Sequence, residues 1–244
     1  MSNRPARLGF LVPPGNPTTE TEVIRMTPAG VSVHFTRMVA HGQTGSLQGQ
    51  EERNRTQIAH LPENVALLAM VKPRVIVLAH TATSYTLGRA GEAALIERLA
   101  RDASVPFITA FGSVVKALTH LQARRVAFGT PYGEDATLQC KANLEAHGFE
   151  VTGFGRLEGV VNIYDETSER AAQLARRIDT PDADAVFLSG VGMPTVDVLE
   201  RLEQELGKPV VSSAAAMMWN ALRVAGVRAR VDGFGGLLAD GHAA

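Results

Sequence analysis

The chain repeats one pattern of residues at an interval of roughly 103 positions, and this repeat constrains its fold more than any other feature. Residues 75–84 and 185–195 are apolar runs, rich in β-branched residues, that end abruptly in small and hydroxyl-bearing residues. Further on, Glu97 and Glu200 occupy the same place in two similar segments, and nine residues after each lies a proline that introduces another apolar run. A unit of this length is too long for a solenoid repeat and suits two α/β halves.

Each of the two apolar runs is typical of a buried parallel strand that opens into a loop. In open α/β sheets, ligands bind outside the carboxyl ends of the strands. Two matched strand ends that face each other would therefore form one pocket between two lobes. Further strands are predicted at residues 8–12, 31–38 and 125–129, and a helix, interrupted at Pro62, at residues 53–70.

The expected N-terminal lobe comprises residues 1–112 together with residues 214–244, and the expected C-terminal lobe comprises residues 113–213. This division follows from the last long helix, at residues 214–224, which we expect to pack back on the first lobe. The polar, glycine-containing loop at residues 43–52 is expected to lie close to the pocket.

Composition excludes several classes of function. The chain has 244 residues and a formal charge of -1, without a basic stripe, so nucleic acid is not an expected partner. It contains no run of 18 apolar residues and no signal-like apolar core, so we expect a cytoplasmic protein without membrane contact. Cys140 is the one cysteine, which excludes an internal disulfide, and the seven histidines show no metal-ligand spacing.

Five segments, taken in order, resemble the aspartate/glutamate racemase superfamily, and within it the branch of maleate cis-trans isomerases and arylmalonate decarboxylases. The resemblance implies an α/β fold of two pseudo-symmetric lobes, each a parallel sheet flanked by helices. It also implies a small carboxylate substrate between the lobes and no metal or cofactor. Homo-oligomers are usual among related enzymes, and the oligomeric state of this chain stays open. The segments are residues 12–22, 82–84, 193–200, 208–213 and 219–226.

The chain departs from this family at the residues that carry its chemistry. Such families place a cysteine at one or both strand ends, and the corresponding positions here hold Ala82 and Gly190. Cys140 cannot replace either, because it lies in the middle of a predicted helix, a helix length away from the strand end. It is predicted to be an ordinary helix residue, since isolated cysteines behave as small hydrophobic residues. Racemisation by two thiols and isomerisation by a thiol nucleophile are therefore closed to this chain without a substitute.

Decarboxylation demands less of the protein, because the leaving carboxylate supplies the electrons. The protein must stabilise an enolate-type intermediate, and each pre-placed donor contributes about 3–4 kcal/mol to that stabilisation. By the resemblance, the donors are the hydroxyls of Thr83 and Ser84 and the amides of Ser84 and Val191. Both hydroxyls could equally cap the next helix. The proton could come from Tyr132, from water or from His80.

Tyr132 follows a predicted strand directly and matches a family tyrosine that binds substrate carboxylate, with simple packing as the alternative. Asn16 either caps a turn or contacts a carboxylate. Asn162 resembles a substrate-contacting asparagine of the family. Pro14, beside Asn16, and Gly190 complete the predicted binding set.

His80 is the one histidine at a strand end and is either a catalytic base or a hydrogen-bonded structural residue. The sequence thus favours a cofactor-independent decarboxylase or lyase on a small mono- or dicarboxylate, with Ser84, Tyr132 and His80 as the catalytic candidates. Two alternatives stay open. One is an isomerase or hydratase that uses His80 as its base, and the other is a non-catalytic carboxylate-binding pseudoenzyme.

Overall fold

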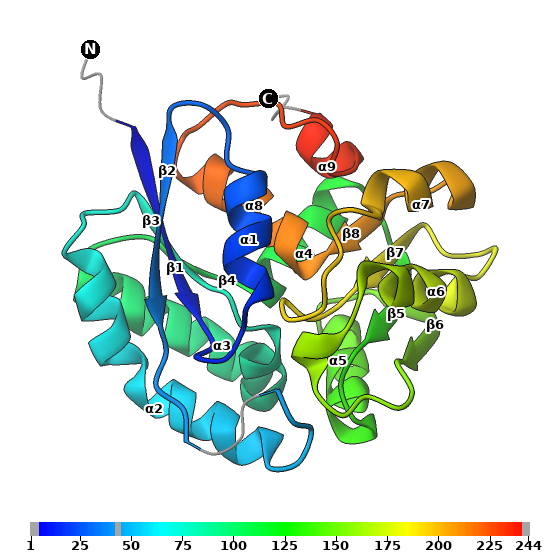
Figure 1. Cartoon of the computed structure of the whole chain (residues 1–244), viewed down its shortest axis with the longest axis horizontal. Coiled ribbons are helices and arrows are strands. Elements are labelled where there is room, and N and C mark those ends of the chain that lie inside the picture. Colours follow the sequence, from blue (N-terminus) through cyan, green and yellow to red (C-terminus); the bar gives the residue numbers. More distant parts are fainter. Residues whose placement is uncertain (1–4, 42–44, 241–244) are drawn as a thin grey trace.

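The computed structural model describes residues 5–41 and 45–240, and these form two four-stranded parallel sheets. The first sheet has the strand order β2-β1-β3-β4 and the second β6-β5-β7-β8, so the two sheets repeat one topology (Figure 1). The strands are β1 (Ala6–Val12), β2 (Val31–Arg37), β3 (Val75–Leu78), β4 (Phe107–Thr109), β5 (Arg125–Thr130), β6 (Glu150–Arg156), β7 (Ala185–Leu188) and β8 (Val210–Ser212).

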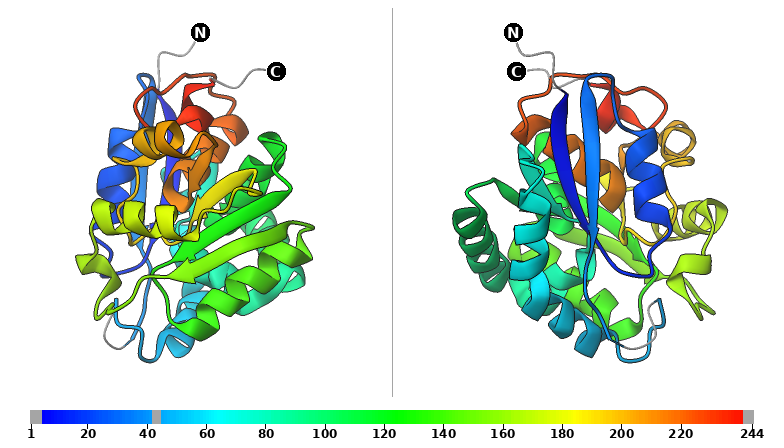
Figure 2. Two further views of the ribbon diagram at one scale, coloured as in Figure 1. Left: turned by 90° about the vertical axis from the view of Figure 1, so that its right-hand side faces the viewer. Right: turned by 60° about the vertical axis from the view of Figure 1, so that its left-hand side comes forward.

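Helices cover both faces of each sheet, and Figure 2 shows α5 and α6 on opposite sides of the second one. The predicted α/β fold of two similar parallel sheets is therefore confirmed. The helices are α1 (Thr18–Arg25), α2 (Gln50–Ala69), α3 (Thr81–Ala103), α4 (Ala110–His120), α5 (Glu134–Ala146), the 3-10 turn η1 (Ile163–Asp165), α6 (Ser168–Ile178), α7 (Leu199–Leu206), α8 (Ser213–Val224) and α9 (Gly236–Ala239).

Two helices join the lobes. Each follows the fourth strand of its own half, and α4 and α8 then pack against each other between the sheets (Figure 1). Asn220 on α8 donates a hydrogen bond to Ser113 on α4 over 3.0 Å. As expected, α8 also contacts β3 and α1 of the first lobe. The exact lobe boundaries at residues 112–113 and 213–214 stay a prediction.

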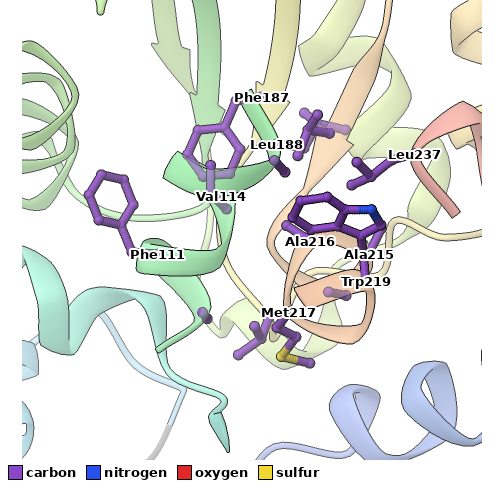
Figure 3. Close-up of a cluster of buried hydrophobic side chains, with 14 of the residues drawn as sticks. Phe111, Val114, Phe187, Leu188, Ala215, Ala216, Met217, Trp219 and Leu237 are labelled. Atoms are coloured by element: carbon purple, nitrogen blue, oxygen red, sulfur yellow. The ribbon is translucent and has the colours of Figure 1, made fainter. Parts of the chain in front are cut away.

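The core between the lobes is apolar and close-packed. Figure 3 shows Phe111 and Val114 of α4, Phe187 of β7, and Met217 and Trp219 of α8 as members of one cluster of buried side chains. Burial of so much aliphatic and aromatic surface is the main source of stability for such a domain. The packing fixes the two sheets relative to each other and thereby fixes the space between their strand ends.

Two local predictions were wrong. The expected loop after β3 is the first turn of α3, which begins at Thr81, only three residues beyond the strand, and is kinked at Gly88 (φ 65°, ψ 172°). The helix expected at residues 53–70 begins earlier, at Gln50, and continues through Pro62. Small and hydroxyl-bearing residues are compatible with the start of a helix as well as with a loop, so sequence pattern alone did not separate the two. Within the described part of the chain, no helix is long and apolar enough to span a membrane.

Candidate functional site

A cavity lies at the carboxyl ends of the central strands, where the two lobes meet. It is narrow, about 30 Å³, and is bounded by the β1–α1 loop, the first turns of α2 with the residues before them, the start of α3, and the loops after β5, β6 and β7. Its lining residues are Pro13, Asn16, Gly45, Ser46, Leu47, Gln50, Arg53, Asn54, Gln57, His80, Tyr132, Ile163, Tyr164, Val191 and Gly192. Of the predicted site residues, Asn16, His80, Tyr132 and Val191 therefore line one cavity.

Asn16 ties the two lobes together at the edge of the cavity. Its side-chain oxygen accepts hydrogen bonds from the backbone N–H groups of Thr18 and Thr19, at 2.8 and 3.0 Å, and so caps α1. Its amide nitrogen donates to Val191 O over 3.2 Å, and Thr19 Oγ1 donates to the same oxygen over 2.9 Å. Asn16 thus performs the capping role, while its predicted carboxylate contact stays a prediction.

Glu22 holds the same loop one turn further along α1. Its Oε1 atom accepts from the backbone N–H groups of Thr195 and Val196, at 2.6 and 3.0 Å. Its Oε2 atom is buried, without a hydrogen-bond partner among the described residues. Burial raises the pKa of Glu22 to about 7, although the two backbone hydrogen bonds oppose this.

Tyr132 and Gly190 lie together, as predicted. A Cβ atom on Gly190 would lie 3.2 Å from the Tyr132 hydroxyl, and the hydroxyl of Thr81 is a hydrogen-bond partner of Tyr132. Ser213 links these groups, because its Oγ atom accepts from Thr81 Oγ1 and from Gly190 N, each over 3.2 Å. Burial raises the pKa of Tyr132 well above its usual range, so the phenol stays protonated and can donate.

His80 lies directly before α3 and faces the cavity. Its Nδ1 atom lies 2.7 Å from Thr83 Oγ1, so the Thr83 hydroxyl is hydrogen-bonded to the imidazole and orients the ring. Burial, together with the smaller effect of the positive charge of Arg53, lowers the pKa of His80 to about 4. The imidazole is therefore neutral at pH 7.

Ser84, Pro14 and Asn162, like Thr83 and Gly190, are not among the lining residues. Ser84 is buried and donates to Glu92 Oε1 over 2.6 Å, because a helix turns successive side chains by about 100° and directs this one away from the cavity. The carbonyl of Pro14 accepts from Arg37 over 3.0 Å. Asn162 caps η1 by accepting from the N–H of Tyr164 over 3.0 Å. Substrate contact by these three residues stays a prediction, and this geometry does not support it.

Arg53 is the most important residue that the sequence reasoning missed. Its half-buried guanidinium lines the cavity and donates to the backbone carbonyls of Ser46 and Gln48. In residues 5–41 and 45–240, no carboxylate lies within ion-pairing distance of it. Desolvation lowers the pKa of Arg53, yet arginine remains charged in proteins. A half-buried cation without a counter-ion is suited to bind an anion.

Tyr164 closes the cavity on the side of the second lobe. A Cβ atom on Gly192 would lie 2.8 Å from Cε1 of the Tyr164 ring, so only glycine leaves room for this packing. Burial raises the pKa of Tyr164 to about 12, opposed by the charges of Arg53 and Arg37. Tyr164 therefore presents a neutral phenol close to a guanidinium.

The cavity has no thiol among its lining residues. Ala82 is buried in the first turn of α3, and Cys140 is buried on α5 with the Tyr85 hydroxyl as its hydrogen-bond partner. Burial raises the pKa of Cys140 to about 12, so its sulfur stays protonated and is a poor nucleophile. Cys140 is an ordinary helix residue, as the sequence indicated.

Arginine, two tyrosines, a neutral imidazole and several side-chain amides thus surround one small cavity. The described residues contain no cluster of three His, Cys, Asp or Glu side chains that could hold a metal ion. Fold and site together define a class of protein: a two-lobed α/β protein with a small polar cavity between two parallel sheets.

Comparison with known proteins places the chain within this class. The family model of arylmalonate decarboxylase matches residues 8–238. A maleate isomerase of Nocardia farcinica is 33% identical, over 95% of each chain. An arylmalonate decarboxylase of Bordetella bronchiseptica is 33% identical, over 67% of this chain and 70% of its own. A maleate isomerase of Pseudomonas putida S16, solved with maleate, superposes with a TM-score of 0.88 at 25% identity, covering 98% of this chain and 99% of its own. The chain belongs to the family of arylmalonate decarboxylases and maleate isomerases.

Proposed function

We propose that this protein is a cofactor-independent decarboxylase that acts on a small malonate-type dicarboxylate through an enolate-type intermediate, without a thiol. The observation that carries the proposal is Arg53, a half-buried cation that faces the cavity without a carboxylate partner among the described residues. The relatives support a carboxylate ligand, since one of them was solved with maleate.

Arg53 is the only cationic side chain among the described residues that line the cavity, and this asymmetry suits decarboxylation. The carboxylate that the product retains would pair with the guanidinium. The second carboxylate would face the apolar side formed by Pro13, Ile163 and Val191, where its charge is poorly stabilised. Loss of that carboxylate as CO2 relieves this unfavourable contact.

The chemical step leaves an electron pair on the substrate. The bond between the α-carbon and the leaving carboxylate breaks, and its electrons form an enediolate on the retained carboxylate. Negative charge at the oxygens beside Arg53 therefore increases in the transition state. An interaction that strengthens in the transition state accelerates the reaction. Tyr132 lies on the same cavity and, as a neutral phenol, can donate a second hydrogen bond to those oxygens.

His80 is the proposed proton donor to the α-carbon. In the free protein its imidazole is neutral, because burial and Arg53 lower its pKa. A bound dianion offsets the charge of Arg53 and raises the pKa of His80, so the imidazole can take up a proton when substrate binds. Transfer of that proton to the enediolate gives the monocarboxylate product.

A second candidate function is also catalytic, but its reaction is isomerisation or hydration instead of decarboxylation. The same neutral imidazole, held by Thr83 at 2.7 Å, could act as a general base in isomerisation or hydration of an unsaturated dicarboxylate. The names of the relatives, most of which are maleate isomerases, favour testing this route too.

The test is incubation of the purified protein with malonate, methylmalonate, phenylmalonate and maleate in D2O, followed by proton NMR. Decarboxylation gives a monocarboxylate with deuterium at its α-carbon, isomerisation gives fumarate, and hydration gives malate. The proposal expects turnover of a malonate, lost in Arg53→Met and strongly reduced in His80→Gln. Turnover of maleate alone supports the second candidate. Binding without turnover of any acid indicates a carboxylate-binding pseudoenzyme and contradicts both.

A further inference from the structure

We propose that Gln57 sets the substrate class of this site, and that the substituent on the malonate α-carbon is a small hydroxyl-bearing group instead of an aryl ring. The inference rests on the proposed function, in that a carboxylate binds at Arg53. It adds the identity of the group that lies beside that carboxylate.

Gln57 lines the cavity, and its side-chain oxygen is unpaired. Its side chain is 4% exposed, and its Oε1 atom is buried without a hydrogen-bond partner among the described residues. Buried polar atoms are almost always paired, so an unpaired one on a cavity wall indicates a group supplied by a ligand. Nearby Asn54 differs, because its amide nitrogen already donates to Thr86 Oγ1 over 3.1 Å.

The spacing of Gln57 and Arg53 on α2 sets the distance between the ligand carboxylate, which binds Arg53, and the ligand substituent, which meets Gln57. Both are on α2, four residues apart, so they share one helix face with their Cβ atoms roughly 6 Å apart. A single small molecule can therefore reach both, with its carboxylate on the guanidinium and its substituent on the amide. A hydroxyl is the best match, because it both donates and accepts and can serve either end of a glutamine amide.

The side of the cavity formed by α2 is unsuited to an aryl ring. Gln50, Asn54 and Gln57 face it with amide groups, and Ser46 lies before them. An aryl ring against this surface would cover the Gln57 amide without pairing it.

The experiment compares hydroxymalonate and methylmalonate, two dianions that differ by replacement of a methyl group with a hydroxyl. Isothermal titration calorimetry measures both dissociation constants with the wild-type protein, with Gln57→Leu, and with Gln57→Met as a second variant should the first fail to fold. Gln173→Leu, at an exposed position on α6, is the matched control. The wild type and the control are expected to prefer hydroxymalonate by about tenfold, and the Gln57 variants by less than about twofold.

Equal affinity of the wild type for the two acids, or a preference that survives in both Gln57 variants, would overturn the inference while leaving the proposed function intact. A failure of the proposed decarboxylation is distinguishable, because it appears as the absence of malonate turnover in the proton NMR assay, whatever the two dissociation constants are. A site that holds no carboxylate at Arg53 would bind neither dianion. That result would also remove the basis of the inference.

Discussion

The hydroxyl of Tyr132 lies against Gly190 and leaves little room for a side chain at that position. A Cβ atom on Gly190 would lie 3.2 Å from this oxygen and 2.9 Å from Cγ of Pro131. Gly190 also has a backbone φ angle of +98°, which residues other than glycine rarely adopt. At the position that corresponds to the second cysteine of the family, this chain therefore has glycine, and the backbone conformation there disfavours any other residue. Simple restoration of a thiol there is opposed by both effects.

Replacement of Gly190 tests this relationship. Gly190→Ala is expected to lower the free energy of unfolding by roughly 1–3 kcal/mol, because the new Cβ atom meets Pro131 and Tyr132 in an unfavourable backbone conformation. Urea unfolding followed by circular dichroism provides the measurement. Gly133→Ala is the matched control, since Gly133 has a φ of -65° and open space around its Cβ direction. Equal stability of the two variants would show that Gly190 is not constrained.

The ionisation of His80 should respond to a bound anion. In the free protein we expect NMR titration of the imidazole to give a pKa near 4, because burial and Arg53 disfavour the charged form. A bound dianion raises this pKa, so at pH 7, where malonate is already the dianion, binding takes up a proton. Calorimetry at pH 7 in buffers of different ionisation enthalpy measures the uptake. His80→Gln should abolish it, and uptake that persists in this variant would assign the proton elsewhere.

Glu22 makes the stability of the fold depend on pH. Its folded-state pKa of about 7 lies above its unfolded value, so the folded protein binds the proton more tightly. The free energy of unfolding should therefore fall as the pH rises from about 4.5 to 7, by at most about 3 kcal/mol. Glu22→Gln keeps an oxygen for Thr195 and Val196 and should lose this dependence in urea unfolding at pH 5 and 8. Glu97→Gln, at an exposed site, should retain the wild-type slope.

Arg53 should dominate the affinity for carboxylates. Arg53→Met is expected to weaken malonate binding by roughly 10- to 100-fold, because a hydrogen-bonded ion pair is lost from a desolvated site. Arg53→Lys should be intermediate, since an ammonium keeps the charge but not the bidentate geometry. Arg55→Met is the control on the same helix, where the side chain is exposed and pairs with Glu51. Calorimetric titration with malonate that gave similar constants for Arg53→Met and Arg55→Met would contradict the assignment.

The sequence predicted those features that depend on a repeated apolar pattern. The runs at residues 75–78 and 185–188 are buried strands in matching positions of two sheets, and Tyr132 and Gly190 meet as expected. The pattern succeeds here because buried parallel strands leave a continuous apolar signal and because the strand ends must lie at one edge.

The remaining parts of the site depend on details that a single sequence does not encode locally. Ser84 was expected at a loop tip, but the first turn of α3 directs it to Glu92. Arg53 and Gln57 were overlooked although both lie in the helix predicted at residues 53–70, because the early part of this helix is polar and its amphipathic pattern is weak. Only the packed structure shows that these polar side chains face a cavity rather than solvent.

The most direct test of the central claim is a crystal structure of the wild-type protein with malonate, determined beside that of Arg53→Met. We expect one malonate carboxylate within hydrogen-bonding distance of the Arg53 guanidinium and the Tyr132 hydroxyl, with the second against Ile163 and Val191. At the same malonate concentration, the occupancy of this position should be much lower in the variant. Malonate bound away from Arg53, or bound identically in the variant, would contradict the proposal that Arg53 binds the substrate carboxylate in this thiol-free site.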